Sequence, residues 1–190
     1  IRLEVRVDHA AWHAPKELEL KLSLRVPYAW VEIRGEKLLL DKDCVLLEGR
    51  HYRSDVLEAL ELPVLKGATR PNALPLPGEV WVSAKVEQGI AFARLLESTG
   101  RSEVMRGVVI DVSEAGSKSP AEANIAVIPR GLPRISYGRP PKCAAWRMDD
   151  AKLLRDMGLV LDTVKSYPKM YEGVAEIRLG PDEPMIVPKT

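Results

Sequence analysis

The amino-acid sequence predicts a mainly β fold, an antiparallel β-sandwich or barrel with a few short helices. Two observations predict it: apolar and polar residues alternate along several short segments, and 15 prolines interrupt the chain. Alternation with a period of two gives a strand one buried face and one solvated face, which is typical of antiparallel sheets. Many short strands with few helices between them are typical of sandwiches and barrels.

The first half of the chain carries the clearest strand signals. The residues at 18, 20, 22, 24 and 26 are all Leu or Val, and polar residues lie between them until Pro27 ends the pattern. The same reasoning predicts strands at 3–7, 18–26, 28–34, 38–40 and 44–47, and a short helix at 54–62 with Ser54 as its N-cap.

The second half mixes strands with two irregular stretches. Prolines make 63–78 an extended connection, neither a helix nor a central strand. A helix is expected from Asp149 to Met157, where Gly158 ends it. Further strands are predicted at 80–86, 104–112, 124–128, 174–179 and 184–187.

Size and composition favour one soluble domain. The chain has 190 residues, of which 46% are hydrophobic and 29% are charged, enough to bury a core. Within residues 1–190 we distinguish four parts, namely an N-terminal β extension 1–62, the connection 63–78, a core 79–147 and a C-terminal extension 148–190.

Charge, hydropathy and cysteine usage bear on the class of partner, the cellular location and the state of the cysteines. The net charge of +1 favours no particular class of partner. No apolar run approaches the roughly 18 residues that a membrane span needs, so we expect a cytoplasmic protein or a component of a virus particle. Cys44 and Cys143 lie far apart, which favours two reduced thiols over a disulfide framework or a zinc site.

Asp111 is the candidate catalytic residue. It follows the apolar run 108–110, and a carboxylate at the end of a buried strand can have a raised pKa and act as a general base. In the alternative interpretation, the strand continues and Asp111 lies on its solvated face. The pattern alone favours this alternative.

The segment 129–147 is a candidate contact surface, because it holds five basic residues and no acid, with Tyr137 and Trp146 among them. Cations beside aromatic rings can hold phosphates and stack bases. The four prolines and two glycines of this segment also suit an extended arm that grips a neighbouring subunit, and a solvated loop is a third interpretation. The candidate contacts for a nucleic acid or a protein partner are Arg130, Arg134, Arg139, Arg147 and Trp146.

Five short segments between residues 76 and 147 stand out together. They are Leu76-Pro77-Gly78-Glu79, Gly100-Arg101-Ser102, the Gly-x-x-Ile-Asp run from Gly107 to Asp111, Arg130–Ile135 and Arg139–Lys142. In their order along the chain they resemble motifs of the superfamily of trimeric dUTP pyrophosphatases and dCTP deaminases.

The resemblance implies a β-clip barrel that forms trimers, with active sites between subunits. It implies that the protein binds a deoxynucleoside triphosphate and hydrolyses it to the monophosphate and pyrophosphate, with Mg²⁺ on the phosphates. Arg101, Ser102 and Lys142 would hold phosphate oxygens, and Asp111 would orient or deprotonate the attacking water. Lys142 stands where the family usually has Arg, so a point charge replaces a planar fork.

The sequence departs from the family at several positions, which leaves two functions open. Ala126 falls where the deaminases place a catalytic Glu, so deamination is not implied, and Glu114 replaces the aromatic residue that covers the base. One function is nucleotide binding or hydrolysis by a degenerate relative. The other is a non-enzymatic structural or assembly subunit, for example in a virion, acting as a homo-oligomer or within a larger assembly. Nucleic-acid binding through 129–147 is a third possibility.

Overall fold

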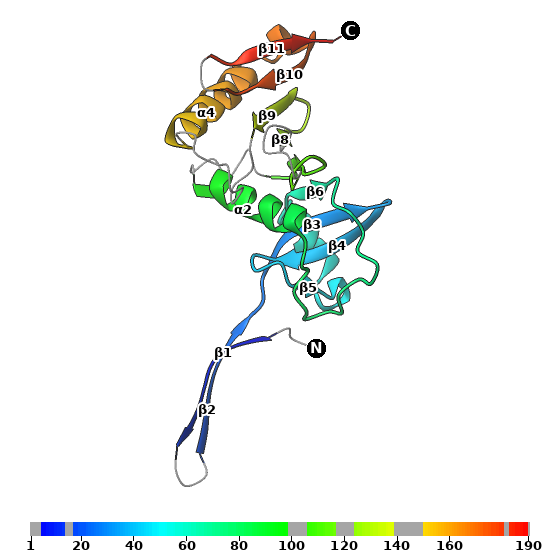
Figure 1. Cartoon of the computed structure of the whole chain (residues 1–190), viewed down its shortest axis with the longest axis vertical. Coiled ribbons are helices and arrows are strands. Elements are labelled where there is room, and N and C mark those ends of the chain that lie inside the picture. The colour runs from blue at the N-terminus through cyan, green and yellow to red at the C-terminus, as the bar shows by residue number, and fades with distance from the viewer. Residues whose placement is uncertain are drawn as a thin grey trace.

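The described part of the chain forms one nine-stranded sheet, flanked by helices, and a separate two-stranded hairpin (Figure 1). A computed structural model describes residues 5–13, 17–98, 106–116, 124–138, 150–180 and 183–189. The protein is mainly β with few helices, which confirms the coarse fold prediction. The sheet is mixed, however, and differs from the antiparallel sandwich or barrel that the sequence predicts.

The hairpin pairs β1 (Val5–His13) with β2 (Glu17–Leu24) in antiparallel register and extends away from the sheet (Figure 1). Both strands form where alternation predicts them, although β1 is longer than expected. Its cross-strand pairs put apolar residues opposite apolar residues, with a bulge between Val7 and His9. These pairs are Val5 with Leu24, Val7 with Leu22, Ala10 with Leu20 and Trp12 with Leu18.

The sheet has the strand order β11-β10-β9-β8-β7-β6-β3-β4-β5. Its strands are β3 (Pro27–Ile33), β4 (Glu36–Asp41), β5 (Leu46–Leu47), β6 (Val64–Lys66), β7 (Val109–Asp111), β8 (Ile125–Ile128), β9 (Arg134–Gly138), β10 (Val174–Arg178) and β11 (Met185–Pro188). Three neighbouring pairs are parallel: β3 with β6, β6 with β7, and β9 with β10. Parallel neighbours need a crossover connection, which is usually a helix. The sequence predicted neither of the two long helices over its full length.

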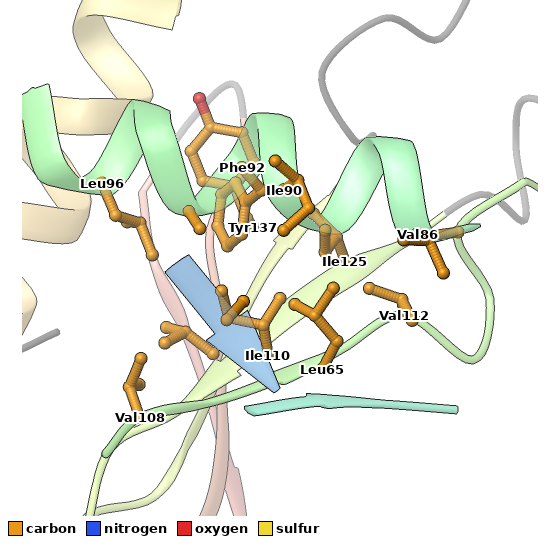
Figure 2. Close-up of a cluster of buried hydrophobic side chains, with 14 of the residues drawn as sticks. Leu65, Val86, Ile90, Phe92, Leu96, Val108, Ile110, Val112, Ile125 and Tyr137 are labelled. Carbon is orange, nitrogen blue, oxygen red and sulfur yellow. The ribbon is translucent and has the colours of Figure 1, made fainter. Parts of the chain in front are cut away.

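The two long helices supply two of the three crossovers. Helix α2 (Ala84–Ser98) connects β6 to β7, and α4 (Asp150–Ser166) connects β9 to β10. Their buried side chains join one core with the same face of the sheet. Figure 2 shows Ile90 and Phe92 of α2 among the sheet residues of this core, and the rings of Phe92 and Tyr137 lie 4.9 Å apart. On the opposite face, Leu57 of α1 (Ser54–Ala59) packs with Leu39 of β4 and Leu47 of β5.

Helix α2 corrects the strand predicted at 80–86. Alternating apolar residues suggested a strand, but the chain becomes helical at Ala84, because its buried residues recur at helical spacing from Val86 through Ile90 and Ala93 to Leu96. Gly89 lies on this face. A Cβ there would come within 2.9 Å of the Val112 side chain, so glycine permits the close approach of helix and sheet.

Two further expectations were wrong. The segment 63–78, predicted as an extended connection, contains β6, a central strand between β3 and β7. Pro63 lies just before this strand, where a missing N–H is tolerated, and its carbonyl still accepts a hydrogen bond from the Trp30 amide at 2.8 Å. Helix α4 continues past Gly158, which is buried, because Met157, Leu161 and Val164 extend one apolar stripe.

Short 3-10 turns complete the described structure. They are η1 (Gly49–His51), after β5, and η2 (Pro168–Tyr171), between α4 and β10. The one-turn helix expected near 119–122 lies outside the described residues.

Candidate functional site

Charged side chains gather on the face of the sheet that α2 and α4 do not cover. Asp111 aligns with Ala126 of β8, which aligns with Ser136 of β9 and then with Arg178 of β10. The residues between these positions are apolar and face the helices, since side chains alternate along strands. Ile110, Val127, Ile135 and Ile177 are accordingly buried. The sheet therefore places Asp111 on the face away from its core.

Four side chains from three strands form an ion-pair network on this face. Arg134 of β9 reaches across β8 and donates from Nη1 to Oδ2 of Asp111. Its Nε donates to Oε1 of Glu176 at 3.2 Å, and Arg178 Nε donates to Oε2 of Glu176 at 2.7 Å. The main-chain amide of Ser113 donates to Oδ1 of Asp111 at 2.9 Å. Acids and bases thus alternate, and both oxygens of each carboxylate accept a hydrogen bond.

The network keeps both carboxylates ionised. Burial alone raises the pKa of Asp111, but the hydrogen bonds from Arg134 and Ser113 outweigh it and hold that pKa below its ordinary value. Burial likewise raises the pKa of Glu176, and the bonds from Arg178, Ser136 and Arg134 lower it overall. Burial lowers the pKa of Arg134, and its two acidic partners raise it above the ordinary value.

This geometry bears directly on the role expected for Asp111. A general base near neutral pH needs a raised pKa and an oxygen that can accept a proton. Asp111 has a lowered pKa, and both of its oxygens already accept bonds. The arrangement is that of a carboxylate which ties β7 to β9.

The structure brings together two of the residues singled out in the sequence and leaves most of the others undescribed. Asp111 and Arg134, assigned separately to catalysis and to partner contact, form one ion pair. Arg130 is exposed in the turn between β8 and β9. The remaining candidates lie outside the described residues: Arg101, Ser102, Arg139, Lys142, Trp146 and Arg147.

Sequence reasoning missed Glu176 and Arg178. The signal was present, because Glu and Arg two residues apart on a strand point to the same face. It did not point to Asp111 or Arg134, because nothing in the sequence indicates that β10 pairs with β9. That parallel pairing depends on the α4 crossover.

A groove opens beside the network, at the end of the sheet where the β8–β9 turn faces η2. Its volume is about 740 Å³. Most of its lining is apolar, and four charged residues also line it. The apolar lining comprises Ile128, Leu132, Pro133, Pro168, Tyr171, Val174 and Ala175, with Gly131, and the charged lining comprises Arg134, Lys169, Glu172 and Lys189.

A second cluster of charges fixes the base of the hairpin. Arg6 of β1 binds Asp43 at 2.9 Å, and Arg94 of α2 binds the other oxygen of Asp43 at 3.3 Å. Arg25, just after β2, pairs with the buried Asp41. These contacts join the hairpin to both β4 and α2, and every acid named here has a basic partner.

The described ranges contain no group of three or more His, Cys, Asp or Glu side chains placed to hold a metal ion. No helix within the same ranges combines the length and the apolar character that a membrane span needs. No protein-family model and no curated protein matches this sequence.

Proposed function

We propose that this chain is a non-enzymatic assembly subunit whose β1–β2 hairpin, hereafter the arm, packs against another protein molecule. The observation that carries the proposal is the exposed apolar face of the arm. The exposed fraction is 76% for Trp12, 49% for Leu20 and 53% for Leu22. Val5, Val7, Leu18 and Leu24 on the same face are also exposed.

An isolated two-stranded hairpin is only marginally stable in water, and it needs a third strand or a packed layer for independent stability. Contiguous exposed apolar patches on soluble proteins mark interaction surfaces. The arm presents seven large apolar side chains on one face, so its structure is best accounted for by a second layer that covers them.

The strength of such a contact can be bounded. Burying a large apolar side chain completely contributes about 1.5–3 kcal/mol, so seven half-exposed side chains contribute on the order of 5–10 kcal/mol. Association costs about 4–15 kcal/mol in lost translational and rotational freedom. The two ranges overlap, and we therefore expect association that is reversible and depends on protein concentration.

The first occupant we propose for this face is the same face of a second copy. Two apolar faces stacked about 10 Å apart form a small β-sandwich, and such an isologous contact closes after two copies. This is the β-sandwich packing that the assembly hypothesis expects. At the base of the arm, Arg6 binds Asp43 in the turn after β4 and Arg25 binds Asp41 of β4, and these ion pairs hold the arm to the sheet.

Sedimentation velocity over a hundredfold range of protein concentration tests the proposal. Leu20→Ser with Leu22→Ser removes two apolar side chains from the middle of the face, and we expect it to shift association at least tenfold toward monomer. The matched control is Lys21→Ser, on the opposite face of the same strand. A wild-type monomer at all concentrations, or equal association of both variants, would overturn the proposal.

Nucleotide hydrolysis, the dUTPase-like β-clip and the trimer that it implies stay predictions. The lowered pKa of Asp111 and its ion pair with Arg134 favour the assembly role over them. A pyrophosphate-release assay with Mg²⁺ and each deoxynucleoside triphosphate tests hydrolysis, with Asp111→Ala as the control. Turnover that disappears in this variant would restore the enzyme hypothesis.

A further inference from the structure

The groove between the β8–β9 turn and η2 is separate from the arm and has a different character. Tyr171 and Leu132 belong to its apolar lining, and three cations and one acid also line it. Its volume of about 740 Å³ is within the range of pockets that hold ligands of several hundred daltons.

The groove is built from elements that are held in place by hydrogen bonds. The Leu132 amide donates to Pro129 O at 3.2 Å, which closes the β8–β9 turn. The Lys189 amide donates to Gly173 O at 2.8 Å, which holds the end of β11 against the start of β10. Arg134 is fixed by its two acidic partners. A ligand would therefore meet a largely preformed surface.

Two lysines give the groove its electrostatic preference. The charge of Arg134 is balanced by Asp111 and Glu176. Lys189 Nζ donates to the main-chain carbonyl of Glu172 at 2.7 Å, and because this acceptor is neutral it does not offset the lysine charge. Lys169, in η2, is exposed and also lines the groove. The groove thus combines an apolar lining with lysine charges that suit a carboxylate ligand.

Other ligand classes fit this combination less well. A nucleic-acid backbone would leave most of the apolar lining uncovered, and that lining offers one aromatic ring, Tyr171, for stacking a base. A small inorganic anion would leave the apolar lining uncovered. A peptide can cover the apolar lining and supply a carboxylate in one molecule.

We propose that this groove binds an extended peptide segment of a partner protein, with an Asp or Glu side chain next to an apolar one. The apolar side chain packs against Leu132 and Tyr171, and the carboxylate binds Lys169 and Lys189. This site is distinct from the arm, so it gives the assembly subunit a second contact of different chemistry.

A displayed library of random octapeptides, selected on the immobilised full chain, tests this proposal without a prior choice of sequence. We expect the enriched peptides to carry an acid within two residues of a large apolar residue. Fluorescence polarisation with one enriched peptide then measures affinity. We expect Lys169→Ala with Lys189→Ala to weaken binding at least tenfold, and replacement of the peptide's acid by its amide to weaken it similarly.

The matched control is Lys37→Ala, an exposed lysine of β4 outside the groove, which we expect to leave binding unchanged. No enrichment of acidic peptides, or equal binding to the double lysine variant, would overturn the proposal. Equal competition by inorganic phosphate would also overturn it, because it would make the site a simple anion site. The Leu20→Ser, Leu22→Ser variant separates the two proposals, since loss of the arm contact leaves this groove intact.

Discussion

The arm and the central sheet are built from similar strands, yet they differ in what covers their apolar side chains. In the sheet, Leu65, Ile110 and Ile135 are fully buried beneath α2 and α4. In the arm, Leu20 and Leu22 remain about half exposed. Alternation along a strand therefore indicates that one face is apolar. It does not indicate whether that face is buried by other residues of the same chain.

The largest expected effect separates the two regions by stability. Ile110→Ala deletes side-chain atoms from a closed core, and we expect a loss of about 2–5 kcal/mol in the free energy of unfolding. Leu20→Ala removes similar atoms from an exposed face, and we expect a change within about 0.5 kcal/mol for the monomer. Urea denaturation of dilute protein measures both. Equal losses would mean that the arm is part of the cooperative core.

Two glycines with nearly the same φ, Gly67 and Gly35, differ in how closely the rest of the chain packs around them. Gly67, after β6, has φ +84°, and a Cβ there would lie 2.6 Å from the Ser113 amide nitrogen. Gly35 has φ +85° with nothing within 4 Å of such a Cβ. We expect Gly35→Ala to cost about 1 kcal/mol through the backbone alone and Gly67→Ala about 2–3 kcal/mol. Equal costs in urea denaturation would show that the backbone at Gly67 relaxes without penalty.

The ion-pair network predicts a smaller, pH-dependent effect. The pKa of Asp111 is lower in the folded protein than its ordinary value of 3.8. Its ionised form therefore stabilises the fold fully when the pH is above that ordinary value. That contribution disappears as the pH falls through the folded pKa. We expect Asp111→Asn to cost about 1–2 kcal/mol at pH 7 and progressively less below about pH 4.

Thermal unfolding of the wild type and of Asp111→Asn between pH 2.5 and 7 measures how their stability difference shrinks at low pH. Asp55→Asn is a suitable control. Asp55 is exposed, and its ion pair is local to Arg53. A constant difference between Asp111→Asn and wild type at every pH would indicate that the carboxylate charge is not what stabilises the network.

The sequence predicted local structure well where one strand pairs with the next. The hairpin of β4 and β5 around Asp41, and the strands β3, β10 and β11, form close to their expected places. Their signals are local, namely alternation and turn residues. The β6 strand and α2 were missed because three residues after a proline do not resemble a central strand, and because the helix begins inside an alternating run.

The candidate site was only partly visible in the sequence for the same reason. Asp111 was singled out at the end of a predicted strand and Arg134 in the basic segment 129–147, but their contact requires β8 to lie between β7 and β9. Glu176 joins them only because α4 returns the chain parallel to β9. Long-range pairing, rather than residue type, determines whether these charges act separately or neutralise one another.

Hydrogen exchange measured at low and high protein concentration tests the central claim, that the arm is covered by another molecule, most directly. The backbone amides of β1 and β2 should exchange rapidly in dilute protein and become at least tenfold more protected in concentrated protein. The amides of β6 and β7 should be protected equally under both conditions. Unchanged exchange in the arm across a range in which the protein associates would contradict the account, because assembly would then use a different surface.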